Sequence, residues 1–265
     1  MDKNQIIVSV ANQKGGVGKT TLAVNLAASI AYIWKKPTRK KVLLVDSDPQ
    51  ANATLFLTDN DIIPPSQTLS FIYGEKVIRK APELIRKTRV NNLSIIPSSL
   101  TLAGTEFQIY TRLESGRRLI GFLESSASDF DIIIIDCPPA LNIFTLNAFI
   151  ASQYVLVPLP PERLAVEGFR QLADTISLVT DANSRLSMLG IVITLLDQRI
   201  NTHKQYVDIL TSMFGEAILG VIHSSSSLKE SAAKKKTIVE YDKRSRSYRE
   251  YIDLAEIILK KSGLS

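Results

Sequence analysis

The chain has 265 residues, of which 45% are hydrophobic, and its 32 Lys and Arg against 26 Asp and Glu give a net charge of +6. These values fit a soluble globular protein, predicted here as a single domain over residues 1–265, and exclude a disordered chain. The single cysteine excludes an internal disulfide and a multi-thiolate metal site, and the apolar runs are too short to span a membrane. The first five residues contain no apolar signal core, so we expect a cytoplasmic protein that does not bind a membrane.

Short β-branched and apolar runs alternate with helical patterns along the chain. The runs predict strands at Ile6–Ala11, Val42–Asp46, Leu93–Pro97, Ile132–Asp136, Tyr154–Pro158, Met188–Thr194 and Ile218–Ile222. Apolar residues three or four positions apart predict helices at Thr20–Trp34, Arg112–Ser125, Leu164–Thr180, Thr202–Phe214 and about Ser247–Leu259. The last helix should pack on the core through Tyr248, Tyr251, Leu254, Ile257 and Ile258, and Ser224–Ser227 is predicted as a flexible loop. The alternation predicts an α/β fold, with a doubly wound, mostly parallel sheet that binds ligands at the carboxyl ends of its strands.

A glycine-rich segment follows the first predicted strand and leads into the first predicted helix. Its residues are Lys14, Gly15, Gly16, Val17, Gly18, Lys19, Thr20 and Thr21. Glycines let backbone N–H groups converge on phosphate oxygens, and a helix N-terminus adds partial positive charge. In a P-loop of this kind the lysine, here Lys19, reaches the β and γ phosphates, and the Thr20 hydroxyl coordinates Mg²⁺. We therefore predict that ATP and Mg²⁺ bind to this segment.

Three carboxylates stand at the ends of predicted strands, at the edge of the sheet where the P-loop lies. We interpret Asp48 as the residue that positions the attacking water, Asp46 as support for the Mg²⁺ shell, and Asp136 as a Walker B residue that holds Mg²⁺ through water. A lone aspartate after a strand more commonly forms a turn or a cap. Three of them in a chain with a P-loop favour the catalytic interpretation.

The loop differs from the standard P-loop pattern at its first positions. Gln13 stands where a glycine is usual, and a second lysine, Lys14, opens the loop. The segment Lys14–Thr21 therefore resembles the deviant Walker A family. The resemblance implies that Lys14 reaches the nucleotide of a partner subunit and that ATP drives homodimerisation. A cation supplied in this way would neutralise charge on the transferring phosphoryl group.

Further blocks extend the resemblance to ParA-type partition ATPases over nearly the whole chain. They are Ala11–Lys14, Asp46–Thr54, Asp136–Pro139, Pro158, Glu162, Ala165, Glu167–Gly168 and Leu228–Ala232. The resemblance implies a slow ATP hydrolase that a ParB-like partner stimulates. Its ATP-bound dimer would bind DNA without sequence preference and partition plasmid or chromosome DNA over the nucleoid. Two alternatives are an ATPase that uses the same cycle to position a protein cargo and, of a different class, a nucleotide-switched regulator of replication.

The basic residues near the C-terminus are candidates for DNA contacts. Between Lys229 and Arg249 there are eight Lys or Arg and three acids, a local excess of 8 − 3 = +5. A clustered excess of this kind is typical of a surface that binds nucleic acid phosphates. We predict contacts from Lys229, Lys234, Lys235 and Lys236, and by the family resemblance from Arg199. Two features depart from the family: Ser224–Ser227 replaces an arginine-containing stretch, and the glycine expected near Lys235 is absent.

Overall fold

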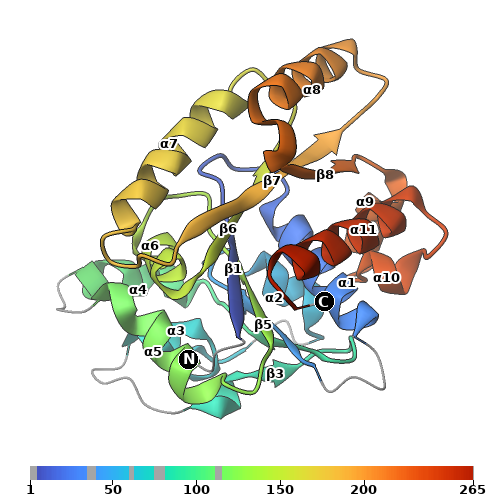
Figure 1. Cartoon of the computed structure of the whole chain (residues 1–265). Coiled ribbons are helices and arrows are strands. Elements are labelled where there is room, and N and C mark those ends of the chain that lie inside the picture. Colours follow the sequence, from blue (N-terminus) through green and yellow to red (C-terminus); the bar gives the residue numbers. More distant parts are fainter. Residues whose placement is uncertain (1–4, 35–39, 60–62, 75–80, 111–114, 265) are drawn as a thin grey trace.

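The computed structural model describes residues 5–34, 40–59, 63–74, 81–110 and 115–264, in which eight strands form one sheet (Figure 1). The strands are β1 (Ile6–Val10), β2 (Val42–Asp46), β3 (Arg86–Lys87), β4 (Leu93–Ile96), β5 (Ile132–Asp136), β6 (Tyr154–Leu159), β7 (Ser187–Leu196) and β8 (Ile218–His223). Their order across the sheet is β3-β4-β2-β5-β1-β6-β7-β8. All the pairs are parallel except that of β3 with β4. The doubly wound, mostly parallel fold predicted from the sequence is confirmed, and β3 is the strand that the sequence did not reveal.

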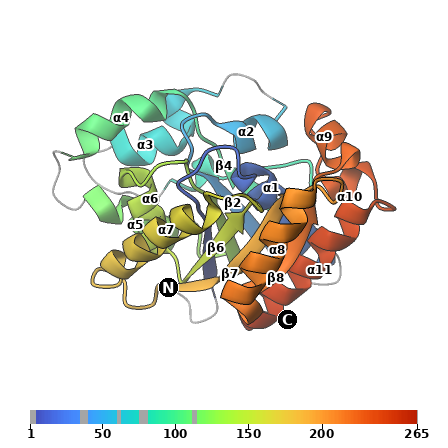
Figure 2. The ribbon, with the colours of Figure 1, turned by 90° about the horizontal axis from the view of Figure 1, so that it is seen from above.

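Helices cover both faces of the sheet, as Figure 2 shows from above. One face carries α1 (Lys19–Ile33), α2 (Asn52–Leu57), α9 (Ser226–Ala233), α10 (Ile238–Tyr241) and α11 (Arg246–Lys261). The other carries α3 (Leu69–Gly74), α4 (Thr101–Tyr110), α5 (Arg118–Ser126), α6 (Ile143–Ala151), α7 (Ala165–Val179) and α8 (Asn201–Phe214). None of the helices in the described ranges combines the length and apolar character needed to cross a bilayer.

The central strands explain why two separate cores form. In β5, Ile133 and Ile135 pack into one hydrophobic cluster, whereas Ile132 and Ile134 pack into the other. Successive side chains of a strand point to opposite faces, so a strand covered on both sides must be apolar throughout. The same alternation occurs in β2 and β1. Because β1 and β2 each pair in parallel with β5, the carboxyl ends of these three strands lie side by side. This edge carries Asp46, Asp136 and the loop after Val10.

The structure corrects several local predictions. Ser224–Ser227 is not a flexible loop, because α9 begins at Ser226 and Ser225 caps it by accepting a hydrogen bond from the Leu228 N–H at 3.1 Å. Serine is common in loops but is also a strong helix N-cap, and the second role applies here. The helix predicted from Arg112 begins at Arg118 as α5, with residues 111–114 outside the described ranges. In α11, Tyr251, Leu254 and Ile258 are buried as predicted, whereas Ile257 is 37% exposed.

The helix α6 was not predicted because it lacks a polar face. Eight of its residues are buried: Ile143, Phe144, Thr145, Asn147, Ala148, Phe149, Ile150 and Ala151. A helix that is apolar all round has no three- and four-residue stripe to recognise. Its start is nevertheless encoded locally, since the Asn142 side chain accepts hydrogen bonds from the N–H groups of Phe144 and Thr145 at 3.1 and 3.3 Å.

Candidate active site

The glycine-rich loop joins the buried end of β1 to the first residue of α1. Gly16 and Gly18 have φ angles of 74° and 86°, which glycine adopts without the steric cost that a Cβ brings. The loop borders a cavity of about 520 Å³ at the carboxyl edge of the sheet. Its walls include Gly15, Gly16, Gly18, Lys19, Thr20, Thr21, Asp48, Asn52 and Pro139. The P-loop residues and Asp48, far apart in sequence, therefore share one cavity large enough for phosphates.

The two lysines of the loop have different surroundings. Lys19 is buried, and its ammonium donates a hydrogen bond to the Lys14 carbonyl at 2.8 Å. Burial lowers the pKa of Lys19, and the nearby carboxylates of Asp136 and Asp48 partly oppose the shift. The Lys14 ammonium instead forms an ion pair with Glu162 in the loop before α7. In this single chain, Lys14 is held by a carboxylate of its own subunit.

The path of the loop is fixed by hydrogen bonds to Asn12 and Thr194. The Asn12 side chain accepts a hydrogen bond from the Lys14 N–H at 2.9 Å and donates one to the Pro158 carbonyl at the end of β6, at 2.8 Å. The Thr194 hydroxyl donates to the Val17 carbonyl at 2.8 Å, and Val17 itself is buried. These contacts attach the loop to β6 and β7. Val17 is therefore held by its buried side chain and by its carbonyl, which Thr194 binds.

Asp46 and Asp136 lie opposite each other on the adjacent strands β2 and β5. Both are fully buried, and burial raises the pKa of each carboxyl. The oxygens of Asp46 accept hydrogen bonds from the Thr54 N–H and hydroxyl at 2.8 and 2.7 Å and from the Asp48 N–H at 3.2 Å. Among the described residues neither oxygen of Asp136 has a hydrogen-bond partner.

An unpartnered buried carboxylate is costly unless something else satisfies it. Asp136 lies close enough to Thr20 and Lys19 for both to favour its ionised form. A carboxylate and a threonine hydroxyl are hard oxygen donors, which Mg²⁺ prefers. The residues present therefore fit a magnesium site with Thr20 and Asp136 as its nearest protein groups and Asp46, already hydrogen-bonded, as support. Cys137 beside them is buried, and burial raises the pKa of its thiol, which makes it unreactive.

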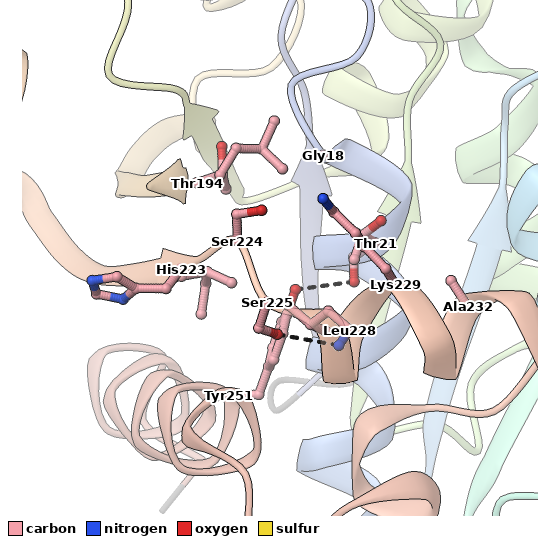
Figure 3. A pocket seen from close by; sticks show the side chains of 12 residues that line it. Gly18, Thr21, Thr194, His223, Ser224, Ser225, Leu228, Lys229, Ala232 and Tyr251 are labelled. Atoms are coloured by element: carbon pink, nitrogen blue, oxygen red, sulfur yellow. Dashed lines mark hydrogen bonds between the residues drawn. The ribbon is translucent and has the colours of Figure 1, made fainter. Parts of the chain in front are cut away.

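A second cavity of about 160 Å³ adjoins the first and was not anticipated from the sequence (Figure 3). Its lining residues are Gly18, Thr21, Thr194, Leu195, Ile222, His223, Ser224, Ser225, Leu228, Lys229, Ala232 and Tyr251. Gly18, Thr21 and Leu195 line both cavities. Leu195 has a left-handed φ of 57° and is 40% exposed although it is large and apolar. It lines both the phosphate-sized space and the more apolar one.

The predicted DNA contacts lie on two neighbouring parts of the surface. Arg199 follows β7, and its side chain is 89% exposed and donates two hydrogen bonds to the Asp197 carboxylate, at 2.9 and 2.6 Å. Lys229 lies on α9, and Lys234, Lys235 and Lys236 follow at its end, all of them exposed. The Lys234 ammonium lies 4.9 Å from the centre of the Tyr241 ring, so part of this run also packs locally. Lys229 additionally lines the second cavity.

Comparison with known proteins agrees with this geometry. Residues 5–188 match the AAA domain family. The chain is 38% identical over 259 residues to the chromosome partitioning protein ParA of Myxococcus xanthus, covering 96% of this chain and 88% of that protein. A plasmid partition protein of Borrelia burgdorferi B31 bound to AMPPNP has a TM-score of 0.81 and 30% identity, covering 97% and 99% of the two chains. Cobyrinic acid a,c-diamide synthase of Mycobacterium smegmatis, with bound ATP analogue and magnesium, has a TM-score of 0.77 and 30% identity, covering 98% and 97%.

The sheet, the glycine-rich loop and the carboxylates at the strand ends define a P-loop ATPase of the deviant Walker A type. Within that class the chain belongs to the AAA domain family and, by its relatives, to the ParA-type partition ATPases. The family predicted from the motifs is thus confirmed. The roles of the individual site residues remain predictions.

Proposed function

We propose that this protein is an ATP-dependent, dimerising ATPase that binds DNA without sequence preference and partitions plasmid or chromosome DNA with a ParB-like partner. The observation that carries the proposal is the single cavity in which Lys19, Asp48 and the P-loop backbone meet, next to the buried Asp136. ATP would bind with its phosphates in this cavity and its base in the second one, which also has Leu195 in its lining. Magnesium bound at Thr20 and Asp136 would neutralise charge on the phosphates.

The chain's own residues then have distinct roles. Lys19 holds the β and γ phosphates once they replace the Lys14 carbonyl as its partner. Asp48 orients water toward the γ phosphate, with its own position fixed because its carboxylate accepts the Gln50 N–H at 2.9 Å. On dimerisation, the Lys14 ammonium leaves its ion pair with Glu162 and binds the nucleotide of the partner subunit. ATP hydrolysis by this protein would be slow in the absence of the ParB-like partner and faster when that partner is bound.

The exposed cations supply the DNA-binding half of the proposal. Arg199, Lys229, Lys234, Lys235 and Lys236 present positive charge from the β7–α8 loop and from α9. Phosphate contacts of this kind give affinity that falls steeply with salt and does not depend on sequence. A protein that works in this way would reside in the cytoplasm on the nucleoid.

The test is binding of the purified protein to random-sequence duplex DNA with ATP, ADP or no nucleotide, across a salt series. We expect binding with ATP alone, weakening as salt rises. The matched variant changes Lys234, Lys235 and Lys236 together to Glu, which should abolish DNA binding and leave ATP-dependent dimerisation intact. Absence of DNA binding by the wild-type protein in every nucleotide state would refute the DNA-binding half and leave the ATPase assignment in place.

A further inference from the structure

One arginine side chain joins three helices on the face of the sheet that carries α1. Arg89, in the turn between β3 and β4, donates hydrogen bonds to the Phe56 carbonyl in the last turn of α2, at 2.9 Å, and to the Lys235 carbonyl just after α9. Its Nε–H donates to the Glu240 carboxylate of α10 at 3.1 Å. A guanidinium presents its donors in a rigid, planar fork. The three contacts therefore fix the positions of these helices relative to one another.

The first of these helices, α2, forms part of the wall of the cavity that the P-loop borders. Asn52 in its first turn and Phe56 in its last turn both line that cavity. Between them, Thr54 donates its N–H and its hydroxyl to the Asp46 carboxylate. The last carbonyls of a helix have no partner within the helix, and the helix dipole favours a cation near them. Arg89 therefore caps a helix that belongs to the nucleotide site.

The second helix, α9, ends in residues 234–236, called here the lysine turn, which belong to the proposed DNA surface. The Lys235 N–H donates to the Ala232 carbonyl at 3.0 Å. The Lys236 N–H donates to the Ser231 carbonyl at 2.8 Å. This pair of hydrogen bonds is that of a Schellman turn, in which Lys235 has the left-handed φ of 52°. The backbone of this turn sets the direction of the lysine side chains, and Arg89 holds that backbone through the Lys235 carbonyl.

The third helix, α10, is attached to the nucleotide site from a second side. The Asn25 side chain, on α1, accepts the Ile238 N–H at 2.7 Å and donates to the Thr21 carbonyl at 2.9 Å. Thr21 lines the cavity that the P-loop borders, and Asn25 is only 1% exposed. The lysine turn and the start of α10 are therefore held by two chains of hydrogen bonds. One leads through Arg89 to α2, the other through Asn25 to α1, and both reach a residue of the cavity wall.

We propose that Arg89 is a positioning residue that sets the lysine turn for DNA phosphates according to the nucleotide bound beside α2. The inference rests on the proposed function, since it needs ATP in the cavity and DNA on the lysine turn. A nucleotide that shifts α2 moves the Phe56 carbonyl, and the rigid guanidinium carries this displacement to the Lys235 carbonyl. Coupling between two binding sites is reciprocal. DNA on the lysine turn must therefore tighten the nucleotide by the same factor by which the nucleotide tightens DNA.

The experiment measures the dissociation constants of magnesium-AMPPNP and of random-sequence duplex DNA, each with and without the other ligand at saturation. It uses the full chain and the variants Arg89→Lys, which keeps the charge but loses the planar fork, and Glu240→Gln, which removes the charge that Arg89 pairs with. The matched control is Arg86→Lys on the same hairpin, because the Arg86 side chain bonds Gln67 and not these helices.

We expect each ligand to tighten the other about tenfold in the wild type, a usual size for coupling between two sites. In Arg89→Lys that factor should fall to about one, while the affinity for AMPPNP without DNA stays unchanged. In Glu240→Gln the factor should fall to about three or less, because the guanidinium loses the ion pair that orients it. Arg86→Lys should match the wild type.

Three results would overturn the inference. If Arg89→Lys binds DNA as the wild type does, a positive charge is sufficient at this position and the fork positions nothing. If DNA affinity falls but DNA still tightens AMPPNP about tenfold, Arg89 supports the lysine turn without connecting it to the nucleotide. Wild-type coupling in Glu240→Gln would contradict the inference even if Arg89→Lys does not fold. A wild-type protein that binds AMPPNP but no DNA would instead refute the proposed function itself.

Discussion

Replacing Asp136 with asparagine tests whether the buried carboxylate is kept for magnesium at the expense of stability. The side chain is 0% exposed, faces Asp46 on the adjacent strand and lacks hydrogen-bond partners among the described residues. An unsatisfied buried polar group costs about 1–3 kcal/mol, and a buried charge costs more. Asparagine keeps the shape and removes the charge. We expect Asp136→Asn to raise the free energy of unfolding by about 1–2 kcal/mol without nucleotide, or roughly 2–4 °C in Tm.

The stability that Asp136→Asn gains over the wild type should increase with pH. Burial raises the pKa of Asp136 above its ordinary value of 3.8, so the folded state binds this proton more tightly than the unfolded state. Its contribution to stability is therefore lost as pH rises from about 3.8 toward the raised folded value. Asp46 behaves likewise, with its pKa raised to about 7. The advantage of Asp136→Asn should be largest at neutral and alkaline pH and should shrink in acid.

The same substitution should remove the response to magnesium-ATP. A ligand at 100 times its dissociation constant stabilises the wild type by about 2.7 kcal/mol. Thermal melts in EDTA, in ATP with EDTA and in ATP with magnesium separate the two effects, with Asp253→Asn on the exposed side of α11 as control. If Asp136→Asn melts below the wild type in EDTA, the carboxylate is a structural group. If the magnesium response survives, Asp136 is not part of the metal site.

Three further substitutions test other parts of the proposal. Lys14→Gln should abolish ATP-dependent dimerisation in light scattering while leaving Tm unchanged, since its ion pair with Glu162 is partly exposed; normal dimerisation would refute the role in trans. Asp48→Ala should dimerise with ATP but release phosphate at least tenfold more slowly, and unchanged turnover would remove it from the mechanism. Lys235→Gly should stabilise the fold by about 0.5–1 kcal/mol in urea unfolding, because Lys235 has a left-handed φ of 52°. A loss of stability there would mean that the lysine side chain matters more than the backbone strain.

The parts of the fold that could be predicted are those whose structure is determined by neighbouring residues in the sequence. Strands β2 and β5 are continuous apolar runs because both of their faces are buried, and a run of that kind can be recognised without knowing its neighbours. The P-loop was predictable because its glycines are required by the backbone angles at Gly16 and Gly18. The carboxylates followed from their place at strand ends, since parallel strands end at one edge of the sheet.

The second cavity was not predictable, because its walls come from separate segments. Thr21, Thr194, Ser224 and Tyr251 line one space only after α1, β7, β8 and α11 have packed together. The hydrogen bond between the Glu250 carboxylate and the His223 imidazole has the same origin, because the two residues are 27 positions apart in the sequence. Nothing in the serine-rich segment revealed that Ser225 caps a helix while Ser224 faces a cavity. Tertiary packing, and not the local sequence, determines which of these adjacent serines caps the helix and which lines the cavity.

The turn at Lys235 shows how packing can replace a local signal. The position after a helix that adopts a left-handed backbone conformation is usually occupied by glycine, yet here it is a lysine. Arg89, from the turn between β3 and β4, donates a hydrogen bond to the Lys235 carbonyl and forms an ion pair with Glu240. Glu240 in turn accepts the Thr237 N–H in the capping box of α10, at 2.9 Å. Contacts from the far edge of the sheet therefore hold the turn, and with it the direction in which the lysines of the proposed DNA surface point.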